Sequence, residues 1–157
     1  MMTIPTLLND LESYIPHYHV SLPEVSKGSV GWHIDHTLLT MNLIIDVMKK
    51  SNPEGYRWSF NIMRILVCNT GKIPRGKAKA PDVVQPKSLI TPESLQLQLA
   101  AAKEGLMTLE NLHPNQYFTH PFFGDLNRKP TVRFLKIHTY HHVKIIRDII
   151  SKMQTAQ

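Results

Sequence analysis

Apolar side chains recur every three or four residues along much of this chain, and this period limits its fold more than any other feature. The period is clearest over residues 29–50 and 127–153. No segment shows sustained alternation of apolar and polar residues between hairpin turn signals, as half-buried strands do. We therefore expect an all-α fold, because helices bury such apolar stripes against one another.

Prolines and capping residues divide the chain into one short and several long helical segments. Pro16 closes the first segment, and Ser29 is a candidate N-cap of the second. Thr91 and Pro92 are typical of a helix start, and Pro130 fits the first turn of the last helix. The expected helices run from about 5–14, 29–50, 57–70, 91–112 and 127–153. We expect a four-helix bundle with a short extra N-terminal helix, in a single domain over residues 1–157.

The composition indicates a globular protein without a membrane segment. A chain of 157 residues with 42% hydrophobic residues can bury a substantial core. No window of 18 consecutive apolar residues occurs, and the N-terminus lacks the layout of a signal peptide, so we expect a cytoplasmic location. The single cysteine, Cys68, excludes an internal disulfide and a CxxC motif, and its apolar neighbours predict a buried, inert thiol.

The net charge of +6 is concentrated in one segment, GKIPRGKAKAPDVVQPK, at residues 71–87. Its prolines and glycines predict a loop. The loop is either a solvated connection between helices or a basic lid over a site for an anionic ligand. The lid would use Lys72, Arg75, Lys77 and Lys79. Nucleic acid is disfavoured as the partner, because no helix-turn-helix, zinc-finger or aromatic RNA-reading pattern accompanies the charge.

Two of the three histidines in FLKIHTYHHVKI, residues 134–145, are predicted to share one helix face. A helix turns by about 100° per residue, so His138 and His142 point in similar directions, whereas His141 lies at the flank. The other residues on that face are mostly apolar: Leu135, Thr139, Ile145, Ile146, Ile149 and Met153. His138 and His142 are therefore expected to face the core.

A third histidine, His36, lies in the middle of a similar stripe on the second helix. That stripe contains Trp32, His33, Leu39, Thr40, Leu43 and Val47. The opposite side of the helix is also apolar, with Ile34, Leu38, Met41, Ile45 and Met48. A helix that is apolar almost all round lies centrally in its bundle or against a second subunit, and we expect a homodimer.

Three imidazoles at the centres of apolar stripes suggest a metal site. A buried neutral imidazole still needs partners for its donor and its acceptor, and a divalent ion such as zinc or nickel accepts imidazole nitrogens. We predict that His36, His138 and His142 are the ligands. His33 and His141 are candidate further ligands or partners of ligands. Asp35 and Tyr140 are candidate partners or proton-transfer groups, with solvated or interface positions as the alternative.

Three segments carry a family resemblance: SVGWHIDHTLLTMNLI at 29–44, IPRGKAKAP at 73–81, and HPFFGDLNRKPTVRFLKIHTYHHVKII at 120–146. Together they resemble the DinB/YfiT-like superfamily of metal-binding four-helix bundles, in a branch of unknown function, over about residues 7–150. The resemblance implies an up-down-down-up bundle, commonly a homodimer, with nickel or zinc at a three-histidine site. Those histidines correspond to His36, His138 and His142. The chain departs from many members at residues 143–145, where they carry Arg-Gly-Gln, and at His33, where they carry another polar residue.

A three-histidine site with one position open to water is of the catalytic type. Such an ion lowers the pKa of bound water toward about 7 or activates a thiolate. Members of the superfamily include transferases and isomerases that use low-molecular-weight thiols, and others are labelled metal-dependent hydrolases. We therefore expect a metal-dependent enzyme acting on a small molecule, either a thiol-dependent S-transferase or isomerase or a hydrolase. With a thiol, the basic loop would receive the carboxylates of a peptide-like or sugar-linked molecule.

Two other classes stay open from the sequence. In the first, the protein is a non-catalytic module, in which the ion only joins two helices and the second helix mediates dimerisation. In the second, it is a basic nucleic-acid-binding protein, whose affinity would fall steeply with salt. Fold and ligand set alone do not choose between an enzyme and a metal-stabilised module.

Overall fold

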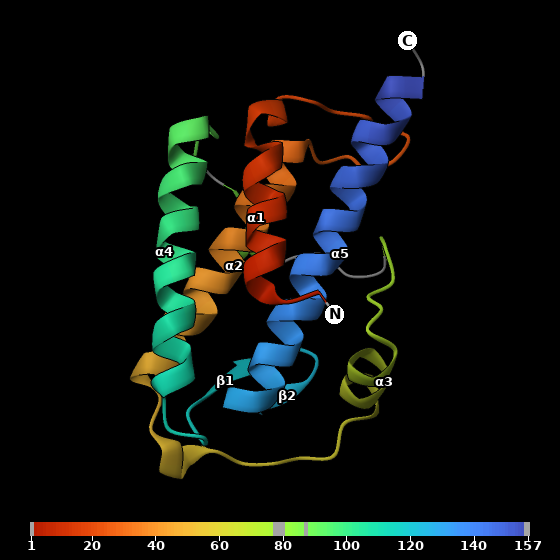
Figure 1. The fold of residues 1–157 in the computed structure, drawn as a ribbon. Helices are drawn as coiled ribbons and strands as arrows, with labels where there is room; N and C mark the ends of the chain where they lie inside the picture. Colours follow the sequence, from red (N-terminus) through yellow and green to blue (C-terminus); the bar gives the residue numbers. More distant parts are fainter. Residues whose placement is uncertain (1, 77–80, 87, 156–157) are drawn as a thin grey trace.

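Four helices pack around one hydrophobic core (Figure 1). The computed structural model describes residues 2–76, 81–86 and 88–155. The core helices are α1 (Ile4–Tyr14), α2 (Val30–Lys50), α4 (Pro92–Asn111) and α5 (Arg128–Thr155). α1 and α5 run in one direction, and α2 and α4 run in the other (Figure 1). The mostly helical fold that the apolar period predicts is therefore confirmed.

The N-terminal helix is not an extra element as the sequence suggested. α1 packs against both α4 and α5, and Leu7, Leu8 and Leu11 are fully buried. The peripheral helix is instead α3 (Ile62–Thr70), which packs against α5 at the edge of the molecule (Figure 1). Three leucines on one face are sufficient to make α1 a full member of the core despite its short length.

The helix starts follow the predicted caps, with one exception. Ser29 accepts a hydrogen bond from the N–H of Trp32, and Thr91 forms a capping box with Ser94. The helix expected from residue 57 begins only at Ile62, because the side chain of Asn61 caps it by accepting from the N–H of Arg64. Residues 57–61 form no regular element. The predicted start of this helix was therefore wrong by about one turn.

A short β-hairpin precedes α5, so the all-α prediction was incomplete. β1 (Tyr117–His120) pairs in antiparallel register with β2 (Gly124–Asn127). Gly124 has a φ of 69°, a left-handed value that glycine adopts without strain. Strands of four residues are too short for their alternation to stand out in a sequence. The hairpin leads directly into the first turn of α5, where Thr131 donates a hydrogen bond to the carbonyl of Leu126.

α2 lies at the centre of the bundle, in contact with α4 and α5. The stripe opposite His36 is enclosed there, and its members are at most 1% exposed: Ile34, Leu38, Met41, Ile45 and Met48. On the other stripe, Val47 is 43% exposed. Burial within one chain therefore accounts for the first stripe, whereas the second stripe is half-buried or exposed at Trp32, Leu39, Leu43 and Val47.

Two further expectations concern the cysteine and the membrane. Cys68 lies on α3 and is partly exposed, so the prediction of a buried thiol was wrong. Within the part of the chain that the structure describes, no helix is both long enough and apolar enough to cross a membrane.

Candidate metal centre

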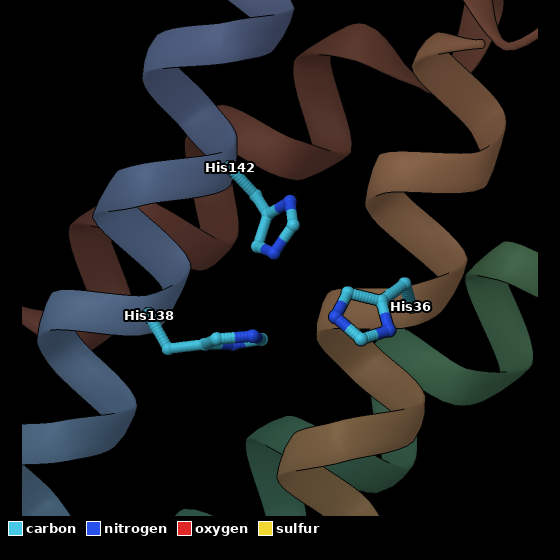
Figure 2. Close-up of side chains that lie close together, drawn as sticks. All are labelled: His36, His138 and His142. Atoms are coloured by element: carbon cyan, nitrogen blue, oxygen red, sulfur yellow. The ribbon is translucent and has the colours of Figure 1, made fainter. Parts of the chain in front are cut away.

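Three histidines from two helices meet inside the bundle. His36 of α2 and His138 and His142 of α5 each offer one ring nitrogen, and these three atoms lie within 4.8 Å of one another. Figure 2 shows the three rings turned toward the space between the two helices. This group could hold a metal ion. Among the described residues, it is the one group of three or more histidines, cysteines or carboxylates close enough to do so.

Helix geometry brings these rings together. His138 and His142 are one turn apart on α5, so their rings are neighbours, with centroids 4.7 Å apart. α2 packs against α5 at the same level, and the His36 ring lies 5.2 Å from that of His138 and 4.9 Å from that of His142. His36 and His142 are buried, and His138 is partly exposed. The site therefore depends on the packing of two long helices, which makes it comparatively rigid.

The backbone of the basic loop orients His36. The Nδ1 atom of His36 lies 2.7 Å from the carbonyl oxygen of Val84, in the short helical turn η3 (Asp82–Val84). Because a carbonyl only accepts, Nδ1 carries the proton and donates it. The other nitrogen, Nε2, then has a free lone pair, and it is the one that Figure 2 shows facing the other rings. This is the tautomer that a metal ligand needs.

A second chain of hydrogen bonds orients His142. Its Nδ1 lies 2.9 Å from the Nδ1 of His33, and the Nε2 of His33 lies 2.9 Å from the hydroxyl oxygen of Ser26. The protons can be placed in two ways along this chain. If His142 donates to His33, then His33 donates to Ser26 and the Nε2 of His142 is free for a metal. In the reverse arrangement that Nε2 carries a proton, so a metal would select the first arrangement.

The donor set fits a late first-row ion such as zinc or nickel. Neutral imidazole nitrogens suit both metals, and three protein ligands leave a coordination position open. At metal–nitrogen distances of about 2.0 to 2.1 Å, ligand nitrogens in a tetrahedral site lie about 3.3 Å apart. The upper limit of 4.8 Å in the structure is wider, so the rings need small rotations to reach bonding distance.

Burial keeps these imidazoles neutral. It lowers the pKa of His138 and of His142 well below the usual value of 6.5, and the neighbouring histidines lower it further. The pKa of His36 is also lowered by burial, and this is partly opposed by the Val84 carbonyl and by Asp35. The pKa of His33 is lowered to about 3, and burial is again the main cause. The site is therefore in its metal-binding protonation state at neutral pH.

His141 and Tyr140 lie beside the three-histidine group. The ring of His141 meets that of His142 edge-on at 5.1 Å, and the backbone of Ile73 hydrogen-bonds to His141. Burial and the nearby charge of Arg75 lower the pKa of His141 to about 4. Tyr140 packs at the edge of the core, with the ammonium of Lys144 4.6 Å from its ring centre. Neither residue belongs to the group that could hold an ion.

Asp35 is directed to another helix. It is 7% exposed, and its carboxylate accepts a hydrogen bond from the side chain of Gln98 on α4. Burial raises the pKa of Asp35, while the hydrogen bond from Gln98 opposes this rise. The arrangement links α2 to α4.

The described part of the basic loop runs past the histidines. Arg75 forms a 2.7 Å ion pair with Asp148 of α5, and its charge contributes to the lowered pKa values of His33 and His141. The Lys72 side chain is exposed. Lys77 and Lys79 lie outside the described residues. Of the four predicted anion-binding cations, the structure therefore brings Arg75 to the site.

Sequence reasoning missed three groups around the site. Ser26 and the carbonyl of Val84 complete the hydrogen bonds of the histidines, and no sequence signal points to either. His120 stacks on Phe123 at 4.2 Å and meets Phe134 at 4.8 Å, and Phe134 in turn packs against His138. A histidine within an aromatic run was a signal that could have drawn attention to His120. Trp32, which was placed in the His36 stripe, stacks directly on His36 at 5.0 Å.

Comparisons with known proteins identified no relative of this chain. No family model matches the chain, and no match was found among curated proteins or among solved structures. What the chain shows of its function therefore comes from the three-histidine group and the groups that orient it.

Proposed function

We propose that the protein is a cytoplasmic metal-dependent enzyme of the DinB/YfiT-like superfamily that binds one nickel or zinc ion through His36, His138 and His142. One observation carries the proposal. Three neutral imidazoles turn a nitrogen to a common point, and for two of them the other nitrogen is engaged by Val84 or His33. Histidines that bind a metal through one ring nitrogen usually form a hydrogen bond to the protein through the other.

The chemistry belongs to one of two reaction classes. When bound with three protein ligands, the ion supplies a Lewis acid with a position for water or a thiolate, which serves hydrolysis or thiol transfer to a small molecule. Among the described residues, Arg75 is the cation best placed to bind a substrate carboxylate. Its side chain is 44% exposed and is already paired with Asp148, so an incoming carboxylate would exchange for that partner.

A non-catalytic role is the second candidate. The three ligands join α2 to α5, and the Val84 carbonyl ties the loop to the same point, so a bound ion would stabilise the fold even without turnover. This role predicts lower stability on metal removal and no reaction that depends on the metal.

Metal content tests the site itself. Protein without a histidine tag, purified without added metal, is measured by elemental mass spectrometry beside His36→Ala and His138→Ala. The matched control is His19→Ala, which makes the same change at an exposed residue that is not part of the three-histidine group. We expect about one nickel or zinc ion per chain in the parent and in the control, and loss of the ion in the two site variants. Equal metal affinity in all four proteins would contradict the assignment.

Turnover separates the two candidate roles. Metal-loaded protein and His138→Ala are compared on panels of thiol-transfer and ester or amide hydrolysis substrates, with and without a carboxylate on the substrate. An enzyme shows turnover that is lost in His138→Ala and is weakened for carboxylate substrates in Arg75→Ala. A metal-stabilised module shows no such turnover, although the ion is bound.

A further inference from the structure

α3 has its polarity reversed relative to an ordinary surface helix. Arg64 and Val67 face the protein, whereas Ile62, Met63 and Leu66 are 62%, 52% and 52% exposed. Surface helices normally bury the apolar side and expose the charged one. The reversal is stable in the monomer because Arg64 donates to the carbonyls of Ser59, Phe123 and Asp125, which anchors α3 to the hairpin.

The exposed apolar surface continues beyond the helix. Trp58 is 68% and Phe60 is 70% exposed in the segment before α3, and the Arg64 guanidinium lies 5.9 Å from the Trp58 ring centre. Phe122, at the tip of the hairpin, is 58% exposed, and its carbonyl accepts a hydrogen bond from Asn61. We call this surface the α3 face. It consists of Trp58, Phe60, Ile62, Met63, Leu66 and Phe122.

The size of the α3 face indicates that it is covered in the functional protein. If each of these large side chains offers about 150 to 250 Å² when fully exposed, as aromatic side chains do, the exposed parts of the six add up to roughly 550 to 900 Å². The largest apolar patch of a typical monomer is about 300 to 600 Å². A standard interface buries about 800 Å² on each partner. The α3 face is therefore about as large as one side of a stable interface.

We propose that the α3 face docks against the α3 face of a second copy of this chain. Between Ile62 and Thr70 the one charged residue is Arg64, which is buried, so the face has no charge that would specify a partner of opposite sign. An uncharged apolar face is complementary to another face like itself, and a two-fold axis brings the same patch of two copies together. In this proposal, the dimer expected from the sequence forms through α3.

An anionic lipid surface is the competing occupant, because aromatic side chains lie beside basic residues in this region. Helices that bind at a membrane surface carry exposed cations along their polar side. α3 has none, and at its N-terminal end Arg57 folds back to donate to the carbonyls of Glu54 and Tyr56. These observations favour a second copy over lipid.

Sedimentation velocity over a range of protein concentrations tests the proposal, with Ile62→Lys and Leu66→Lys as variants. The matched control is Leu97→Lys, at a residue that is 75% exposed on α4. We expect the parent and the control to be dimers at about 10 µM, and both α3 variants to dissociate at least about 100-fold more readily. Unchanged circular dichroism shows that each variant is folded.

Two results would overturn the proposal. A monomeric parent, or α3 variants that dimerise like the control, would show that the α3 face does not join two copies. Co-sedimentation of a monomeric parent with vesicles of mixed phosphatidylcholine and phosphatidylserine, lost in Leu66→Lys and kept in Leu97→Lys, would assign the face to lipid. Neither readout involves the metal, so the test is independent of the proposed function.

Discussion

The Nδ1 atoms of His33 and His142 lie 2.9 Å apart, so a candidate metal ligand on α5 shares a hydrogen bond with a histidine on α2. His33 in turn reaches Ser26, which precedes α2. A residue that is not in the three-histidine group can thereby accept the Nδ1 proton of His142 in the tautomer that a metal ligand needs. Metal affinity should therefore depend on His33.

Replacing His33 by Leu should weaken zinc binding by about 10- to 100-fold, the usual cost of removing a hydrogen-bond partner of a ligand. Competition with a chromophoric chelator measures this affinity. His33→Asn, whose amide oxygen can accept from His142, should recover part of the loss, whereas Ser26→Ala should have a smaller effect. If His33→Leu binds zinc as tightly as the parent protein does, then His33 has no part in orienting the ligand.

Metal removal should lower the melting temperature of the parent protein. An ion at a thousand times its dissociation constant adds about 4 kcal/mol to the free energy of unfolding. Differential scanning fluorimetry with and without a chelator measures the shift. His36→Ala should melt at the same temperature in both conditions, and His19→Ala should behave like the parent. A chelator-dependent shift of equal size in His36→Ala would place the stabilising ion elsewhere.

The metal-free protein should lose stability as the pH falls below about 6.5. Burial lowers the folded-state pKa of His33 to about 3 and lowers those of His138 and His142 well below 6.5. Between these values and 6.5 the unfolded chain binds more protons than the folded one does, so the free energy of unfolding rises with pH. Each such proton contributes about 1.4 kcal/mol per pH unit.

Urea unfolding of the metal-free protein at several pH values measures this slope. We expect a stable plateau above pH 7 and a continuous decline toward pH 4. His33→Asn, which removes one of the buried imidazoles, should show a shallower decline than the parent does. A free energy of unfolding that stays constant between pH 7.5 and 5 would mean that the histidines are not buried as neutral groups in solution.

Arg64→Met should destabilise the fold by about 2 to 4 kcal/mol, because it removes the donor from three carbonyls around a buried position. Chemical denaturation measures the change. Arg57→Met is the control, because Arg57 makes similar bonds to carbonyls while its side chain is exposed, and it should cost less than about 1 kcal/mol. Equal losses in the two variants would mean that burial of Arg64 contributes nothing.

The directions of the three histidines were predictable because they are set locally, whereas their meeting depends on the packing of α2 against α5. The spacing of His138 and His142 sets their common face, and the apolar stripe around His36 sets its direction toward the core. The caps at Ser29 and Thr91 were predictable for the same reason, since each involves a hydrogen bond to a residue three positions away. The helix faces and the caps therefore need no knowledge of the tertiary fold.

The features that escaped prediction depend on contacts between distant segments. The orientation of α3 is decided by carbonyls of the hairpin that receive Arg64, about sixty residues further along the chain. Seven of the ten residues 58–67 are apolar and they point in several directions, so the sequence offers no single face to bury. Likewise, the bond between His36 and Val84 uses a backbone atom and leaves no trace in the side-chain pattern.

The bond from His36 to the Val84 carbonyl would also link the loop thermodynamically to an ion bound by the three histidines. A molecule that displaces η3 breaks the bond that sets the His36 tautomer, and so changes the affinity of the site for its ion. By reciprocity, the ion changes the affinity for that molecule by the same factor. Loop position and metal occupancy would therefore be coupled, and a probe attached near Asp82 would report on the ion without touching it.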